Sequence, residues 1–217
     1  MYKTVVFDLD GTLLNTLTDL ADAGNRLCRK YGWPTHERQA YRYFVGNGIP
    51  KLVERLVLAD QRTPAVLEAA LADFKRDYGQ HLRDTTAPYP GIPEMLAKLK
   101  ANGVQLAVFS NKADALAKEV VKDYFGTQYF TIVRGQMTGV APKPAAEGTN
   151  ALLQALHADP ASTLYVGDSN VDVETAHNAN LPCCGAVWGF RPREELNAAG
   201  AEYLAENSDE LYDVIMK

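Results

Sequence analysis

Five short runs of apolar, largely β-branched residues alternate along the chain with segments of helical periodicity, and this alternation constrains the fold more than any other feature. The runs cover residues 4–8, 104–110, 130–135, 163–168 and 183–188. Helical patterns lie at 92–101, 113–125, 145–156, 171–180 and 193–199. Runs that are apolar on both faces are typical of parallel strands covered by helices on each side. The sequence therefore predicts an α/β fold with a doubly wound parallel sheet.

The stretch between the first run and the next core helix carries no strand pattern. Its apolar residues recur at helical spacing, as at Leu20, Leu27 and Leu56, which fits amphipathic helices that pack on one another. The segment 88–91, Pro-Tyr-Pro-Gly, resists helix formation and marks the return to the core. We predict a helical cap domain at 17–87, inserted after the first strand into a core made of 1–16 and 88–217, and suited to act as a lid.

Composition narrows the class of protein and its partners. The 217 residues carry a formal net charge of −5, and the basic residues are dispersed, which argues against nucleic acid as the main partner. No apolar run approaches the length of a membrane span, and the first residues lead directly into a strand without a secretory signal. We therefore expect a cytoplasmic protein with no membrane partner. Its three cysteines, an odd count that includes an adjacent pair, are expected to be reduced thiols.

Asp8 and Asp10 lie two residues apart, where the first run breaks into a turn at Gly11. Because the chain is already turning, the two carboxylates can diverge, one facing a substrate from the strand tip and the other able to give or take a proton. Two carboxylates at a strand end repel each other, and a bound cation or a proton relieves that repulsion. Taken alone, such a pair is as easily explained by a turn or a helix cap.

Chemically distinctive polar residues also stand at or after the ends of later runs. Ser110 could hold a phosphate oxygen together with the first amides of the next helix, or simply cap that helix. Lys143 lies between two prolines, which hold it in an extended turn and would place a fixed positive charge beside an anion. Asp168 and Asp172 stand four residues apart across a strand-to-helix turn, where the alternative is that they only cap the helix.

In this order, the elements resemble the signature of the haloacid dehalogenase superfamily of phosphotransferases: DxDGT, a hydroxyl residue after the second strand, a lysine, and GDSxxD. The resemblance spans the whole chain. It implies a Rossmann-like core with strand order 3-2-1-4-5, in which the first strand lies between the second and the fourth. Within this superfamily, true dehalogenases lack an acid at the position of Asp10, because the halide they release needs no proton. The acid at Asp10 therefore makes the chain similar to the members that transfer phosphoryl groups.

The resemblance also implies roles for particular residues. Asp8 would be the nucleophile that forms an aspartyl-phosphate, and Asp10 the acid and base. Mg²⁺ would be held by Asp8, Asp168 and the backbone carbonyl of Asp10, with Asp172 supporting that site from behind; Ser110 and Lys143 would be catalytic too. Residues expected to bind the phosphate are Gly11, Thr12, Ser110, Asn111 and Lys143.

Two further segments look like those of phosphoglycolate phosphatases, namely 44–55 in the cap and 188–201 near the C-terminus. This similarity implies Mg²⁺-dependent hydrolysis of a small phosphomonoester, with 2-phosphoglycolate as the first candidate. Cap residues expected to contact that substrate are Gly46, Asn47, Gly48 and Lys51. The chain departs from its relatives at Asn15, where an acid is usual, at Asn180, where glycine is usual, and after Pro144, where a second proline is often found.

Several alternatives stay open at this point. The same core and cap occur in β-phosphoglucomutase-like transferases, which return the phosphate to a sugar, and in inorganic pyrophosphatases. A different class would be a non-catalytic sensor of phosphorylated ligands, although such proteins are expected to lose Asp8 or Asp10, and both are present. In each case the partner is a small phosphorylated metabolite, and we expect a monomer or a weak homodimer.

Overall fold

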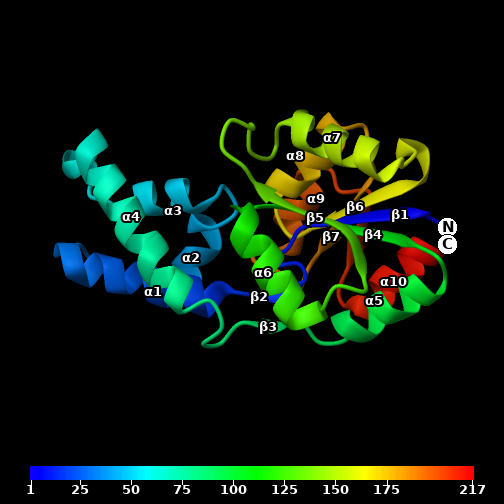
Figure 1. Cartoon of the computed structure of the whole chain (residues 1–217), viewed down its shortest axis with the longest axis horizontal. Helices are drawn as coiled ribbons and strands as arrows, with labels where there is room; N and C mark the ends of the chain where they lie inside the picture. The colour runs from blue at the N-terminus through cyan, green and yellow to red at the C-terminus, as the bar shows by residue number, and fades with distance from the viewer. The chain divides into compact units, whose positions relative to one another are not determined.

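The computed structural model describes residues 1–217, the whole chain. The chain divides into two compact units (Figure 1). One unit, the core, comprises Met1–Asn15 and Pro88–Lys217, and the other, the cap, comprises Thr16–Ala87. The first crossing between the units falls between Asn15 and Thr16, one residue before the expected boundary. No helix combines the length and the apolar character that crossing a bilayer requires.

The core is built on a six-stranded sheet in the order β5-β4-β1-β6-β7-β8. Every neighbouring pair in this sheet is parallel, so the predicted doubly wound parallel sheet is confirmed. The strands are β1 (Thr4–Phe7), β4 (Gln105–Ala113), β5 (Phe130–Gln136), β6 (Thr163–Gly167), β7 (Cys183–Ala186) and β8 (Tyr203–Ala205). Strands β1 and β6 are buried along their whole length, which explains their uninterrupted apolar sequence.

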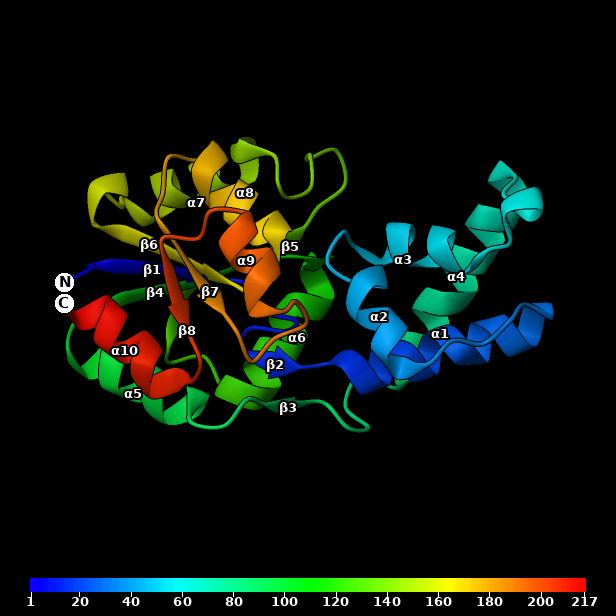
Figure 2. The same cartoon turned by 180° about the vertical axis from the view of Figure 1, so that it is seen from behind.

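Helices cover both faces of this sheet, with α7 and α8 on one face and α5 and α10 on the other (Figures 1 and 2). The core helices are α5 (Ile92–Ala101), α6 (Asp114–Phe125), α7 (Ala146–Leu156), α8 (Asn170–Asn178), α9 (Arg193–Ala198) and α10 (Ser208–Met216). Between the sheet and α7 and α8 lies a hydrophobic cluster that includes Phe109, Leu152, Tyr165 and Val173, all buried. Asn180, which follows α8, adopts a left-handed φ of 56°, a conformation that asparagine tolerates.

The strand register decides which residues meet at one edge of the sheet. Phe7, the last residue of β1, pairs with Val108 of β4 on one side and with Val166 of β6 on the other. Residues just beyond these positions therefore emerge together at the carboxyl edge, where strand order reverses and open α/β sheets bind their ligands. That edge carries Asp8, Ser110 and Asp168.

Two elements at the C-terminal end of the core were not predicted from the sequence. Strand β8 has three residues and pairs with β7 through Cys184 and Tyr203, which is too short a run for an alternation to be recognised. Helix α10 follows it, capped by the side chain of Asn207, which accepts a hydrogen bond from the amide of Glu210. The sheet therefore has six strands, one more than the five predicted from the sequence.

The cap is helical, as expected. It consists of α1 (Leu17–Tyr31), α2 (Arg38–Phe44), α3 (Ile49–Leu56), the short 3₁₀ helix η1 (Ala59–Gln61) and α4 (Pro64–Gln80). Helix α2 was not predicted, because only Tyr41 of its seven residues is buried and no apolar stripe develops. The expectation of no strand was wrong at the last residue, since β3 (Ala87–Pro88) pairs with β2 (Leu14–Asn15) in a separate two-stranded sheet.

A buried carboxylate joins the two ends of the cap segment. Asp19, in the first turn of α1, is 2 % exposed, and its two oxygens accept four hydrogen bonds. Oδ1 accepts from the amide (2.9 Å) and hydroxyl (2.5 Å) of Thr85, and Oδ2 from the amide (2.9 Å) and hydroxyl (2.7 Å) of Thr86. This arrangement ties the start of the insert to its return.

Asp19→Asn is expected to lower the free energy of unfolding of the cap by about 2–4 kcal/mol, because its amide group donates where a buried acceptor is needed. Urea denaturation followed by tryptophan fluorescence measures the loss, since Trp33 lies in the cap. Asp22→Asn, an exposed position of the same helix, is the matched control and should change stability little. Equal stability of the two variants would contradict the role assigned to Asp19.

Candidate active site

Lys143 lies at the centre of a cluster of acidic side chains from different parts of the core. Its ammonium nitrogen is 2.9 Å from Asp8 Oδ1 and 2.6 Å from Asp172 Oδ1, and it donates a hydrogen bond to the hydroxyl of Tyr165 at 3.2 Å. The Lys143 side chain is 1 % exposed. The structure thus brings together the lysine and two of the acids that the sequence singled out.

Asn111 holds the backbone of Lys143 in place. The amide of Lys143 donates to Asn111 Oδ1 at 2.8 Å, and Asn111 Nδ2 donates to the carbonyl of Lys143 at 3.2 Å. The sequence predicts Asn111 as a phosphate-binding residue, but these two bonds direct its side chain to the lysine segment. Its predicted contact with a phosphate stays a prediction.

Asp172 supports the cluster and does not lie open to a ligand. Its Oδ1 accepts from Lys143, and its Oδ2 accepts from the amides of Asp168 and Ser169 and from the Ser169 hydroxyl at 2.7 Å. With Ser169 it forms the capping box of α8, so the expected capping role and the contact with Lys143 coexist. Gly167 is required beside it, because a Cβ there would lie 2.2 Å from Asp172 Cβ.

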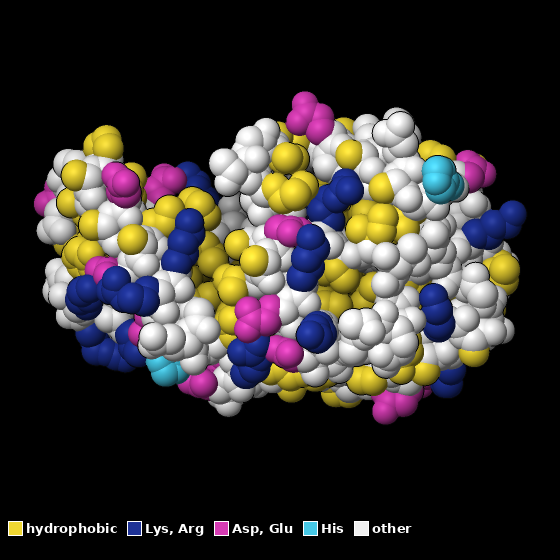
Figure 3. Space-filling model, in the orientation of Figure 1, with side chains coloured by type: hydrophobic (Ala, Val, Ile, Leu, Met, Phe, Trp, Pro, Cys, Tyr) yellow, Lys and Arg dark blue, Asp and Glu magenta, His cyan; other side chains and the backbone are white.

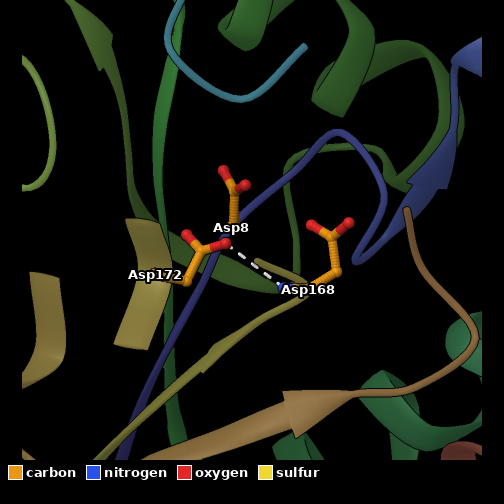
Figure 4. Close-up of side chains that lie close together, drawn as sticks. All are labelled: Asp8, Asp168 and Asp172. Carbon is orange, nitrogen blue, oxygen red and sulfur yellow. Dashed lines mark hydrogen bonds between the residues drawn. The ribbon is translucent and has the colours of Figure 1, made fainter. Parts of the chain in front are cut away.

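Asp168 is held from two sides. Its Oδ2 accepts a hydrogen bond from the amide of Phe190 at 2.7 Å, and its Oδ1 accepts one from the Thr12 hydroxyl at 3.3 Å. Figure 4 shows the Asp168 side chain beside those of Asp8 and Asp172. Gly11, at φ +88°, also faces this carboxylate, since a Cβ there would lie 2.3 Å from Asp168 Oδ2. Thr12, predicted to bind phosphate, uses its hydroxyl on Asp168 here.

The turn after β7 lies within the segment 188–201 that the sequence analysis singled out, but its place at this site was not predicted. Besides the amide of Phe190, it supplies Gly189, where a Cβ would lie 2.2 Å from Asp168 Cβ, and Trp188, whose indole nitrogen donates to the carbonyl of Thr12 at 3.0 Å. A glycine between two aromatic residues directly after a strand was the available signal. The sequence alone does not say which strand that turn would adjoin.

Asp10 diverges from Asp8, as the turn at Gly11 predicts. Its two oxygens lie 3.0 Å and 3.2 Å from the ammonium nitrogen of Lys112, whose side chain is 2 % exposed. Ser110 is buried within β4, which continues to Ala113 instead of ending at 110, and its hydroxyl accepts from the amide of Lys112 at 3.3 Å. The alternative that Ser110 caps the next helix is wrong, because α6 begins at Asp114 and Ala113 is its cap residue.

The local electrostatics follow from gathering more buried acids than bases. Burial raises the pKa of Asp8 to about 6, although Lys143 opposes the shift, and burial together with Asp172 and Asp8 raises the pKa of Asp168 well above its ordinary value. Burial disfavours the ammonium of Lys143, but Asp172 and Asp8 outweigh it and hold its pKa well above the ordinary value. One cation faces three carboxylates, so the cluster favours a further positive charge.

The donor set fits a hard divalent cation. Carboxylate oxygens of Asp8, Asp168 and Asp172 lie within 4.8 Å of one another, and all three residues are buried. Asp8 Oδ1 lies 2.9 Å from the ammonium nitrogen of Lys143, its ion-pair partner. Asp172 accepts four hydrogen bonds and Asp168 only two, so the carboxylates with capacity left to hold a metal ion directly are those of Asp8 and Asp168.

Mg²⁺ is expected to raise the melting temperature more at pH 8 than at pH 5. The raised pKa values of Asp8 and Asp168 mean that protons occupy this cluster at the lower pH and compete with the cation. A hundredfold excess of Mg²⁺ over its Kd corresponds to about 2.7 kcal/mol of stabilisation. Thermal denaturation with Mg²⁺, against NaCl of equal ionic strength, measures the shift, and equal shifts at both pH values would contradict the assignment.

The cap residues expected to contact a substrate lie together around the turn between α2 and α3. Gly46 and Gly48 have φ values of 110° and 82°, and Asn47 Oδ1 between them accepts a hydrogen bond from Arg55 at 2.9 Å. Lys51 is exposed and pairs with Glu54 at 2.8 Å. Within the cap, the turn is therefore built by glycine conformation and braced by Arg55.

Basic residues do not gather on the face of the core shown in Figure 3, where Lys and Arg lie among acidic and uncharged side chains. This agrees with the dispersed charge of the sequence. The side chains singled out by their chemistry are instead gathered at the carboxyl edge of the sheet.

Comparisons with known proteins agree with this fold and with the sequence motifs. Residues 5–186 match the family described as haloacid dehalogenase-like hydrolase. A phosphoglycolate phosphatase of Thiobacillus denitrificans is 31% identical over 201 residues, covering 90% of this chain and 88% of that protein. Another, of Chromobacterium violaceum, is 31% identical over 216 residues, covering 98% and 96%.

Solved structures extend the similarity. A provisionally named phosphoglycolate phosphatase from Lactobacillus delbrueckii subsp. bulgaricus superposes with a TM-score of 0.93 at 28% identity, covering 99% of this chain and 98% of that one. The similarity therefore includes both the sheet and the helical insert after β1. On the matched motifs, sequence relatives and fold, the chain belongs to the haloacid dehalogenase-like hydrolase family.

Proposed function

We propose that this hydrolase is a Mg²⁺-dependent phosphatase of small phosphomonoesters, with 2-phosphoglycolate as its substrate. The single observation that carries the chemistry is the environment of Asp8, a buried carboxylate whose Oδ1 lies 2.9 Å from the ammonium nitrogen of Lys143. The substrate is proposed from the relatives named phosphoglycolate phosphatase, which match nearly the whole chain.

In the proposed reaction, an oxygen of Asp8 attacks phosphorus, and the bond between phosphorus and the ester oxygen breaks as Asp10 gives that oxygen a proton. Asp10 then takes a proton from a water that attacks the same phosphorus. The second step breaks the bond to Asp8, releases inorganic phosphate and restores both acids. The pair thus divides nucleophilic and proton-transfer work between two diverging side chains.

The remaining residues are proposed to bring a dianionic phosphate to a cluster of acids. Lys143 neutralises charge between Asp8 and the phosphate, and Ser110 hydrogen-bonds a phosphate oxygen to hold it in line. Asp8, Asp168 and the carbonyl of Asp10 would hold Mg²⁺, which when bound supplies the positive charge that lets phosphate and carboxylate approach. We also propose that Gly46, Asn47, Gly48 and Lys51 of the cap contact the organic part of the substrate.

A phosphate-release assay over a small panel tests this function. 2-Phosphoglycolate, β-glucose 1-phosphate and pyrophosphate are each supplied with Mg²⁺, with EDTA, and with EDTA followed by excess Mg²⁺. We expect the fastest release from 2-phosphoglycolate, its loss in EDTA and its return with the metal. Activity that persists in EDTA would contradict the proposed mechanism.

The same panel separates the alternatives. Conversion of glucose 1-phosphate to its isomer without net phosphate release identifies a mutase, and preferential cleavage of pyrophosphate identifies a pyrophosphatase. Mg²⁺-dependent binding of these ligands without turnover identifies a sensor. Each of these outcomes replaces the proposed function with a different one.

A further inference from the structure

Lys112 is a second buried ammonium group at the candidate active site, and the proposed chemistry leaves it without a task. Its side chain is 2 % exposed, and its nitrogen lies 3.0 Å and 3.2 Å from the two oxygens of Asp10. It belongs to β4, two residues beyond Ser110. The sequence did not single it out, because a lone lysine is most often solvated.

The two lysines contact different acids and so lie on different sides of the reaction. Lys143 contacts Asp8 and Asp172, on the side where the transferred phosphate would be attacked. Lys112 contacts Asp10, which is proposed to meet the ester oxygen of the leaving group. The organic part of the substrate is bonded to that oxygen. Lys112 therefore lies on the side of the organic part.

The ion pair between Lys112 and Asp10 cannot persist unchanged through the reaction. To act as the acid Asp10 must carry a proton, and the neutral carboxyl then no longer supplies the negative charge that its two oxygens now offer the ammonium group. A nearly fully buried ammonium group would then lose part of its counter-charge, which is costly in a site from which water is excluded. An anionic group on the substrate could supply the negative charge that Asp10 no longer offers to Lys112.

We propose that Lys112 recognises a carboxylate on the organic part of the substrate, so that the substrate class is phosphomonoesters of small hydroxy acids. This inference rests on the proposed phosphatase function. In 2-phosphoglycolate the carboxylate is attached to the carbon that carries the ester oxygen, which places a negative charge close to the group that Asp10 protonates. Lys112 then discriminates by charge between an acid and a neutral molecule of the same shape.

The test compares 2-phosphoglycolate with its neutral isostere, glycolamide phosphate. For the unaltered protein we expect kcat/KM to favour the carboxylate by roughly 100-fold, because the neutral isostere offers no negative charge to the buried ammonium group of Lys112. Lys112→Gln removes the charge but can still donate a hydrogen bond to Asp10, and it should bring the ratio close to one. Lys118→Met, an exposed lysine of α6 paired with Asp114, makes the same change in net charge and should leave the ratio unchanged.

Three results would overturn the inference while leaving the phosphatase function intact. One is equal hydrolysis of both esters by the unaltered protein, which needs no variant and applies even if Lys112→Gln fails to fold. Another is an equal fall of kcat on both esters in Lys112→Gln with an unchanged ratio, which would mean that Lys112 only orients Asp10. The third is a lost preference in Lys118→Met as well, which would indicate a general charge effect. Absence of phosphate release from either ester would instead reject the proposed function.

Discussion

Asp8→Asn is expected to lose roughly 10⁴-fold or more of phosphate release while retaining its fold. The amide of asparagine cannot supply the attacking oxygen, so the bond between residue 8 and phosphorus does not form. The remaining groups of the cluster cannot replace that step. Asparagine has nearly the same shape as aspartate, so Lys143 and the turn at Gly11 keep their surroundings. Phosphate release with 2-phosphoglycolate and saturating Mg²⁺ measures the loss.

Although Asp8→Asn should lose activity, we expect it to be at least as stable as the unaltered protein. Burial raises the pKa of Asp8 to about 6, so the folded protein binds a proton there more tightly than the unfolded chain does. The free energy of unfolding of the metal-free protein therefore falls as the pH rises from the ordinary pKa of an aspartate side chain through about 6. A neutral asparagine avoids that cost at pH 7 and should melt at the same temperature or higher. Asp213→Asn, an exposed position, is the control, and it should keep full activity.

Two outcomes would count against this account of Asp8. Substantial phosphate release by a pure preparation of Asp8→Asn would show that another group attacks phosphorus. A marked loss of melting temperature in the metal-free variant would show that the ionised carboxylate stabilises the fold, contrary to the direction of its pKa shift.

Lys143→Met is expected to lower the free energy of unfolding by about 3–5 kcal/mol at pH 8, because it leaves buried carboxylates with no compensating cation. Asp8 and Asp172 both lose their partner, at 2.9 Å and 2.6 Å, and because their side chains are only 11 % and 1 % exposed, water cannot fully replace it. The loss should shrink at pH 5, where protons neutralise the carboxylates. Urea denaturation of the metal-free protein at the two pH values measures both effects, and phosphate release should be abolished.

A double-mutant cycle with Asp172→Asn distinguishes the ion pair from simple packing. If charge compensation is the cause, Asp172→Asn costs less in the Lys143→Met protein than in the unaltered one, with a coupling of about 1–3 kcal/mol. In the Lys143→Met protein no cation balances the charge of Asp172, so replacing Asp172 by neutral asparagine removes an uncompensated charge. Additive losses would mean that the lysine stem, and not its charge, stabilises this part of the core.

Local patterns were sufficient for much of the fold. The runs at 4–8 and 163–168 match β1 and β6 to within one residue, because strands buried on both faces are apolar throughout. Helix α5 has the predicted bounds, set by Pro93 in its first turn and by the glycine turn that follows. Where few residues are buried, as in α2 and β8, there was no periodicity to recognise.

The sequence predicted most residues of the candidate site, but it predicted fewer of the contacts between them. Asp8, Lys143 and Asp172 were all singled out in the sequence by their chemistry, and the structure brings them together. Lys112 and the amide of Phe190 were missed, since a lysine and a backbone group carry no motif of their own. The sequence does not reveal that one lysine is buried against Asp10 and another is exposed.

By itself, the sequence determined the class of fold, the order of its elements and the carboxylates and lysine at the strand ends, because hydrophobic periodicity and turn residues act over short distances along the chain. Only the tertiary structure decided which of those groups meet. Strand order places β1 between β4 and β6, and parallel register brings Asp8, Ser110 and Asp168 to one edge. Long-range packing then buries Lys143 and Lys112 against different acids, since a buried ammonium group needs a nearby negative charge.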